Sequence, residues 1–122
     1  MRRLRRIRLW RVAATWACSG VVFCGPASAE TRQTNVINGN AVNYAGTYLV
    51  GRNGPLNALI VTNSGDLTST AGIVGDLVGA DHNSALITGS GSIWNNSNDL
   101  TIGNSGSFNG LTISDGGPVA DS

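Results

Sequence analysis

The chain has 122 residues and a formal net charge of +1, but its charges are unevenly distributed. Six of the eight basic residues are arginines within the first eleven positions, and both cysteines lie before residue 30. From Glu30 onward the chain has two arginines, no lysine and seven carboxylates, which gives a net charge of −5. No nucleic-acid partner is expected, because binding to phosphate backbones needs clustered Lys and Arg. From Glu30 onward there is no cysteine, so a disulfide scaffold and a Cys/His zinc site are excluded for that segment, and no cofactor is expected.

The first 29 residues predict a secretory signal peptide. An arginine-rich segment, 1–11, precedes an apolar segment, 12–24, and a Gly-Pro pair. Ala27 and Ala29 then form an A-x-A cleavage site, so cleavage is expected before Glu30. The alternative is an uncleaved membrane anchor, for which the apolar segment is short compared with the roughly 20 residues that span a bilayer.

The segment after the signal peptide contains an internal repeat. Residues 48–67 align without gaps with residues 100–119, at an offset of 52 residues. Residues 83–91 resemble residues 57–65 at half that offset, which indicates a unit of about 26 residues. Chance similarity in a Gly/Asn-rich chain is the alternative, but it does not readily keep ten positions in register. The identical pairs are Gly51/Gly103, Gly54/Gly106, Asn57/Asn109, Leu59/Leu111 and Gly65/Gly117.

Each unit is predicted to contain short strands separated by turns. Alternation places Leu59 and Val61 on one face of a strand and Ile60 on the other. Glycine and asparagine, which tolerate positive φ, occupy the junctions. These features predict an all-β fold, a right-handed parallel β-helix with coils of about 26 residues, whose neighbouring coils lie about 4.8 Å apart. The expected strands are 48–50, 58–62, 72–74, 85–88, 99–102 and 110–114.

The repeat also predicts the domain organisation. A β-hairpin meander is the alternative architecture, but its Asn-Gly turn signals occur only irregularly. The chain stops just after a coil without a capping element, so we expect an N-terminal, C-terminally truncated part of a longer protein. The expected regions are a signal peptide at 1–29, a lead-in or cap at 30–47, and β-helix repeats at 48–122, divided into 48–71, 72–97 and 98–122.

Residues 85–117 resemble a known repeat. They contain TGSGS at 88–92, a tryptophan at Trp94, LTIGNSG at 100–106 and NGLTIS at 109–114. This stretch is similar to the repeat shared by type V secretion (autotransporter) passengers and PEP-CTERM-sorted surface proteins. The resemblance implies a secreted stalk displayed on the outer membrane of a Gram-negative bacterium, with host or surface glycans or proteins as partners. A C-terminal barrel or a PEP-CTERM sorting tail, the implied membrane contact, is absent from this sequence.

Few residues suggest chemistry. His82 is the only histidine and follows Asp81, but no G-x-S-x-G elbow accompanies them, so a solvated turn histidine is expected. Gly75-Asp76 and the Asp-Gly-Gly sequence at 115–117 resemble fragments of calcium-binding nonapeptides. No complete nonapeptide occurs, and neither a metal site nor a catalytic residue is expected.

Two groups of side chains have a possible binding or structural role. Trp94, with Asn95 and Asn96, has the composition of a glycan contact, whereas the alternative is that Trp94 packs over the coil edge as a spacer. Amides at equivalent positions of stacked coils can bond along the axis. Such an exposed ladder is expected to be structural, and its members are Asn57, Asn83 and Asn109.

The sequence therefore predicts a secreted or surface-displayed structural or adhesive passenger of an autotransporter-like protein, and not an enzyme. The first alternative is a carbohydrate-binding or polysaccharide-lyase-type β-helix whose site lies in a missing C-terminal part. A lyase groove needs basic residues, and only Arg32 and Arg52 follow the signal peptide. The second alternative is a truncated reading frame with no function of its own.

Overall fold

The computed structural model describes residues 31–121, so the predicted signal peptide and the cleavage position before Glu30 lie outside the described residues. The described chain consists of strands and turns, and it includes no helix that could span a membrane. The strands are β1 (Thr34–Asn38), β2 (Ala41–Val50), β3 (Ala58–Thr62), β4 (Asp66–Val74), β5 (Ser84–Thr88), β6 (Ile93–Asn96), β7 (Leu100–Ile102), β8 (Gly110–Ser114) and β9 (Val119–Asp121).

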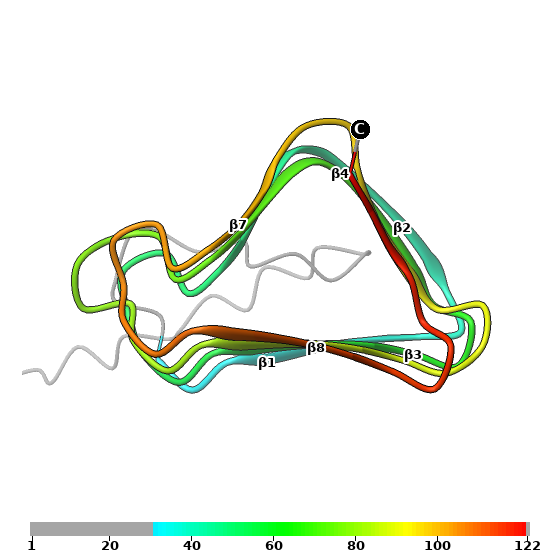
Figure 1. Ribbon diagram of the computed structural model, residues 1–122, viewed down its shortest axis with the longest axis horizontal. Coiled ribbons are helices and arrows are strands. Elements are labelled where there is room, and N and C mark those ends of the chain that lie inside the picture. Colours follow the sequence, from blue (N-terminus) through cyan, green and yellow to red (C-terminus); the bar gives the residue numbers. More distant parts are fainter. Residues whose placement is uncertain (1–30, 122) are drawn as a thin grey trace, which may run out of the picture.

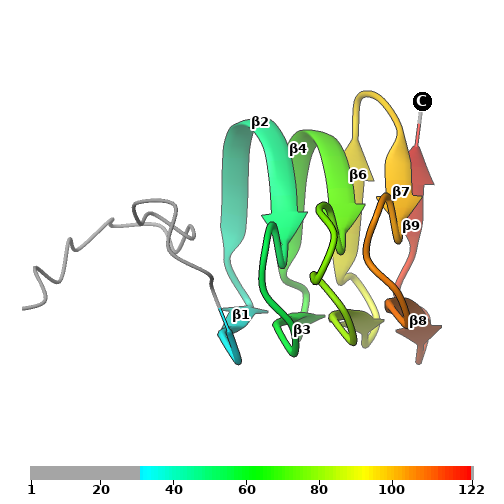
Figure 2. The ribbon, with the colours of Figure 1, turned by 90° about the vertical axis from the view of Figure 1, so that its left-hand side faces the viewer.

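The strands form two parallel sheets that wind around one axis. One sheet has the order β1-β3-β5-β8, and the other has the order β2-β4-β6-β9 with β7 also beside β4. Viewed down the axis, the coils superpose as a rough triangle with the first sheet along its base (Figure 1). The side view shows the coils stacked from β1 and β2 to β8 and β9, and the chain advances with a right-handed sense (Figure 2). The predicted right-handed parallel β-helix is confirmed.

The register gives the length of a coil. Ala58 pairs with Ser84, and Ser84 pairs with Gly110, so successive coils are 26 residues apart. The first coil is shorter, because Thr34 pairs with Ala58. The segment 30–47, expected as a lead-in, contains β1 and most of β2, and both strands pair with the coil that follows them.

The core consists of inward-facing rows along the axis. Leu59, Val61 and Ile87 are fully buried, as the alternation predicted, while the residues between them face outward. Each such side chain contributes roughly 1.5–3 kcal/mol. Ile113 continues the row of Val61 and Ile87 but is 49% exposed, because no described coil lies over its other side.

The first coil carries aromatic and polar side chains inside. Asn35, rather than an aliphatic residue, faces inward on β1, and its Nδ2 donates a hydrogen bond to the hydroxyl of Tyr48. The Tyr48 ring meets Tyr44 edge-on at 5.5 Å and Trp94 edge-on at 6.0 Å between centroids. Burial raises the pKa of Tyr48 to about 12, against the smaller opposing effect of the Asn35 hydrogen bond.

This raised pKa predicts a loss of stability in alkali. Between pH 10 and about 12 the folded chain keeps the Tyr48 proton that the unfolded chain has lost. The stabilisation, about 2–3 kcal/mol, is therefore fully present below pH 10 and disappears as the pH rises through the folded pKa. Urea denaturation at several pH values should show the free energy of unfolding falling between pH 10 and about 12. In Tyr48→Phe the free energy of unfolding should fall less steeply over the same pH range. Equal slopes for both proteins would contradict the assignment.

Candidate functional site

One corner of every coil projects a large side chain outward. This corner column consists of Arg32, Leu56, His82 and Phe108, each of which lies two residues before the first residue of a strand of the first sheet. The backbone N–H groups of Arg32, Leu56 and His82 donate hydrogen bonds of 3.0–3.2 Å to carbonyl groups of the next coil and hold the corner in place. All four side chains are exposed.

The backbone of the corner column is strained. Its residues have φ between 55° and 63°, the left-handed region. A large L-residue there costs about 1–2 kcal/mol relative to the right-handed region. The two other corners of the coil meet the same requirement with small or turn-forming residues. One has Gly39, Asn63, Gly89 and Asp115, and the other has Gly51, Gly75 and Gly103.

Exposed apolar side chains gather along the same edge of the rod. We call Leu56, Leu77, Val78 and Phe108 the loop-edge patch; their exposed fractions are 45%, 44%, 86% and 81%. They lie on the loops that connect β2 to β3, β4 to β5 and β7 to β8, which protrude on the left of Figure 1. Leu56 and Phe108 stand on the strained corners, and exposed apolar side chains gathered on one edge are typical of a contact surface rather than of a packed core.

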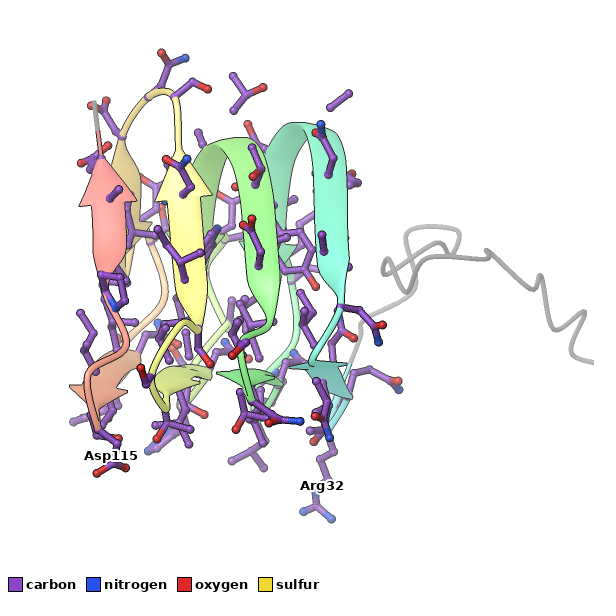
Figure 3. All side chains as sticks on the ribbon, turned by 90° about the vertical axis from the view of Figure 1, so that its right-hand side faces the viewer. Arg32 and Asp115 are labelled. Atoms are coloured by element: carbon purple, nitrogen blue, oxygen red, sulfur yellow. The ribbon has the colours of Figure 1, made fainter. Side chains whose placement is uncertain are left out.

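Charged and aromatic groups accompany the patch. The His82 ring stacks on Phe108, with 5.0 Å between centroids and 20° between planes. The two arginines of the described chain are both exposed on this side, and the Arg52 carbonyl accepts a 2.8 Å hydrogen bond from the Leu77 N–H. Figure 3 shows Arg32 extending below the first sheet at one end of the rod and Asp115 at the other. The loop-edge patch and the arginines beside it therefore combine aliphatic, aromatic and cationic chemistry.

His82 and Asp81 make contacts unlike those of a catalytic triad. The Asp81 carboxylate accepts a 2.7 Å hydrogen bond from the backbone N–H of Ser107, and the imidazole stacks on Phe108. A triad needs the carboxylate on one ring nitrogen and a nucleophile on the other. The exposed position of His82 agrees with the expected solvated turn histidine.

The two aspartates of the sequences that resemble calcium-binding nonapeptides, Asp76 and Asp115, make separate sets of hydrogen bonds. Asp76 accepts a 3.0 Å hydrogen bond from the amide of Asn104. Asp115 accepts hydrogen bonds from the hydroxyls of Thr88 at 2.9 Å and Ser114 at 3.2 Å. Within residues 31–121, no three His, Cys, Asp or Glu side chains gather closely enough to hold a metal ion.

The possible glycan contact at residues 94–96 does not form a stacking platform, because its tryptophan packs inside the coil. Trp94 and Asn96 are fully buried, and only Asn95 is exposed. The indole N–H donates a 3.0 Å hydrogen bond to the hydroxyl of Ser69, which in turn donates at 2.7 Å to Asn96. Gly72 makes room for the ring, since a Cβ there would lie 2.5 Å from the indole. Trp94 is a core residue because small residues of the preceding coil accommodate it.

The asparagine ladder is confirmed, but it is internal. Asn57 and Asn83 are 1% exposed, whereas an exposed ladder was expected. The Asn83 Oδ1 accepts from the backbone N–H of Asn57 at 2.8 Å and from its amide at 3.0 Å. Asn109 accepts in the same way from Asn83, at 2.8 and 3.1 Å. The ladder satisfies backbone donors at the corner before the first sheet and is structural.

The loop-edge patch was not predicted from the sequence. Leu56 and Phe108 occupy equivalent positions of the repeat, 52 residues apart, and each directly precedes a ladder asparagine. A large apolar residue recurring beside a turn is the signal that could have identified the corner column. No protein-family model matches this chain, and no curated protein or solved structure matches it either.

Proposed function

We propose that this chain is a structural and adhesive segment of a secreted or surface-displayed protein, which meets its target through the loop-edge patch. The observation that carries the proposal is the recurrence of large side chains at strained corners, where glycine or asparagine would cost less. Strain of this kind concentrates at functional positions. The target is a host or surface protein or glycan, matched by apolar, aromatic and arginine side chains, which are enriched at binding hot spots.

The solenoid suits a role in display. Its parallel ladders hold the coils in one register, so that the loops between strands project from one edge of a rod (Figure 2). Loops on a rigid scaffold are common positions for binding residues. The signal-peptide pattern of residues 1–29 and the autotransporter-like repeat support delivery through the cell envelope of a Gram-negative bacterium.

Adhesion assays on the full-length chain test the proposal. The chain would be produced in a Gram-negative host, recovered from the envelope or medium, and applied to arrays of host-surface proteins and glycans. We expect binding, and we expect the double variant Val78→Ser/Phe108→Ser to bind at least about tenfold more weakly, a loss of about 1.4 kcal/mol. Retention of the chain in the cytoplasm, or no binding to any array, would refute the proposed function.

A variant on another surface provides the control. Val36 is 46% exposed and faces outward from β1, away from the loops. Val36→Ser removes a comparable apolar group and should leave binding unchanged. Equal weakening by Val36→Ser and by the loop-edge double variant would show that binding does not depend on the loop-edge patch.

A further inference from the structure

The outer face of β6 carries an unassigned modification motif. Asn95-Asn96-Ser97 is the single N-x-S/T sequence in the chain, and it has no proline at the middle position. This is the acceptor pattern for N-linked glycosylation, which requires the asparagine and the hydroxyl residue together. Asn95 and Ser97 are both exposed, while Asn96 between them is fully buried. The two required residues are therefore exposed on either side of a buried one, at the end of the strand.

The surroundings of Asn95 leave its amide open. Its register neighbours on the adjoining coils are Thr68 and Ala120, both small. The Thr68 hydroxyl points to Asp66, at 3.5 Å. Within the described residues the Asn95 side chain makes no hydrogen bond, in contrast to the ladder asparagines, whose amides bond between coils. A side-chain amide that makes no hydrogen bond and lies between small neighbours is accessible to an enzyme.

The inward neighbours of Asn95 hold the motif in place. Trp94 is buried and bonded to Ser69, and Asn96 accepts from the same hydroxyl at 2.7 Å. β6 ends at Asn96, and the chain bends at Ser97, so the motif spans the end of a strand. β6 pairs with the first half of β4, which lies on the right of Figure 1, across the rod from the loops on the left. A group attached to Asn95 would therefore leave the loop-edge patch uncovered.

We propose that Asn95 is an N-glycosylation site whose co-substrate is a glycosyl diphosphate. In the reaction the Asn95 Nδ2 forms a bond to the anomeric carbon, while the bond from that carbon to the diphosphate oxygen breaks. The diphosphate departs with the electron pair, and one amide proton passes to a base of the transferase. This proposal rests on the proposed function for its setting, a chain on its way to the cell surface, while the acceptor itself depends on Asn95 and Ser97 alone.

Peptide mass spectrometry on the full chain, purified from the cells that naturally make it, tests the site. We expect the peptide containing Asn95 to carry a sugar: a single residue from a nucleotide-linked donor, or an oligosaccharide from a lipid-linked donor. Asn95→Gln and Ser97→Ala should both abolish the modification, and Ser97→Thr should retain it. Asn43→Gln is the matched control, because Asn43 lies in the same outer row without the motif and should not alter it.

Two results would overturn the site: an unmodified Asn95 peptide in exported protein, or a sugar that persists in Ser97→Ala. Cell fractionation of the same cultures separates this inference from the proposed function. An exported chain without sugar refutes the glycosylation site and leaves the adhesive role standing. A glycosylated chain that stays in the cytoplasm supports the site and refutes the secreted role.

Discussion

Replacing Asn83 with alanine should lower the free energy of unfolding by about 2–5 kcal/mol. The Asn83 Oδ1 is the acceptor for the backbone N–H and the side-chain amide of Asn57, at 2.8 and 3.0 Å. Both donors belong to a residue that is 1% exposed, so water cannot readily replace the lost oxygen. Each buried polar group that loses its partner costs about 1–3 kcal/mol. The substitution also removes the 3.1 Å hydrogen bond to Asn109.

Urea denaturation followed by far-ultraviolet circular dichroism measures this loss. Asn104→Ala is a suitable control, because Asn104 also bonds to a side chain of another coil, Asp76, but on an exposed surface. Exposed polar contacts contribute little, so the control should cost less than about 1 kcal/mol. If Asn83→Ala is no more damaging than Asn104→Ala, the ladder is not a major source of stability.

The ladder depends on glycine as well as on asparagine. Gly75 has a φ of +79°, and a Cβ built there would lie 1.9 Å from the Nδ2 of Asn109. Gly51 stands in the same relation to Asn83, with a Cβ at 2.3 Å from the amide. The absence of a side chain lets the corner both turn and admit the amide of the following coil. The amide ladder and the glycine corner therefore form one structural unit that repeats with the coil.

This unit explains why most of the fold could be predicted from the sequence. Asn57, Asn83 and Asn109 recur at 26 residues because they must meet along the axis, and the strands after them alternate in the same register. The repeat did not extend to the first coil, and the reason is physical. β1 holds Asn35 at the inward position that Leu59 occupies on β3, and the first coil is shorter than the later ones, because Thr34 pairs with Ala58.

The candidate surface was less predictable, because exposure depends on which partners a fold brings together. The polar residues after Trp94 left open both an exposed platform and packing over the coil edge, whereas Ser69 and Gly72 of the preceding coil create the space that buries the ring in the core. Phe108 has the same chemistry as a core residue, yet its left-handed corner turns it outward, 81% exposed. Neither outcome follows from the local sequence.

The burial of Trp94 leads to the second large effect. Trp94→Ala should lower the free energy of unfolding by about 3–5 kcal/mol, the usual range for a buried aromatic residue. The indole is fully buried, contacts Tyr48 edge-on and occupies the space beside Gly72. Typical domains are stable by about 5–15 kcal/mol, so the variant should unfold at much lower urea concentration. Far-ultraviolet circular dichroism is the suitable signal, because the substitution removes the only tryptophan among residues 31–121.

Three further variants separate the contributions of the indole. Trp94→Phe keeps most of the ring but loses the 3.0 Å bond to Ser69, and Ser69→Ala removes the same bond without a large cavity. Both should cost less than Trp94→Ala. Phe108→Ala truncates an aromatic side chain that is 81% exposed and should cost less than about 1 kcal/mol. Equal losses for Trp94→Ala and Phe108→Ala would contradict the interior position of Trp94, and would restore it as a candidate for contact with glycans.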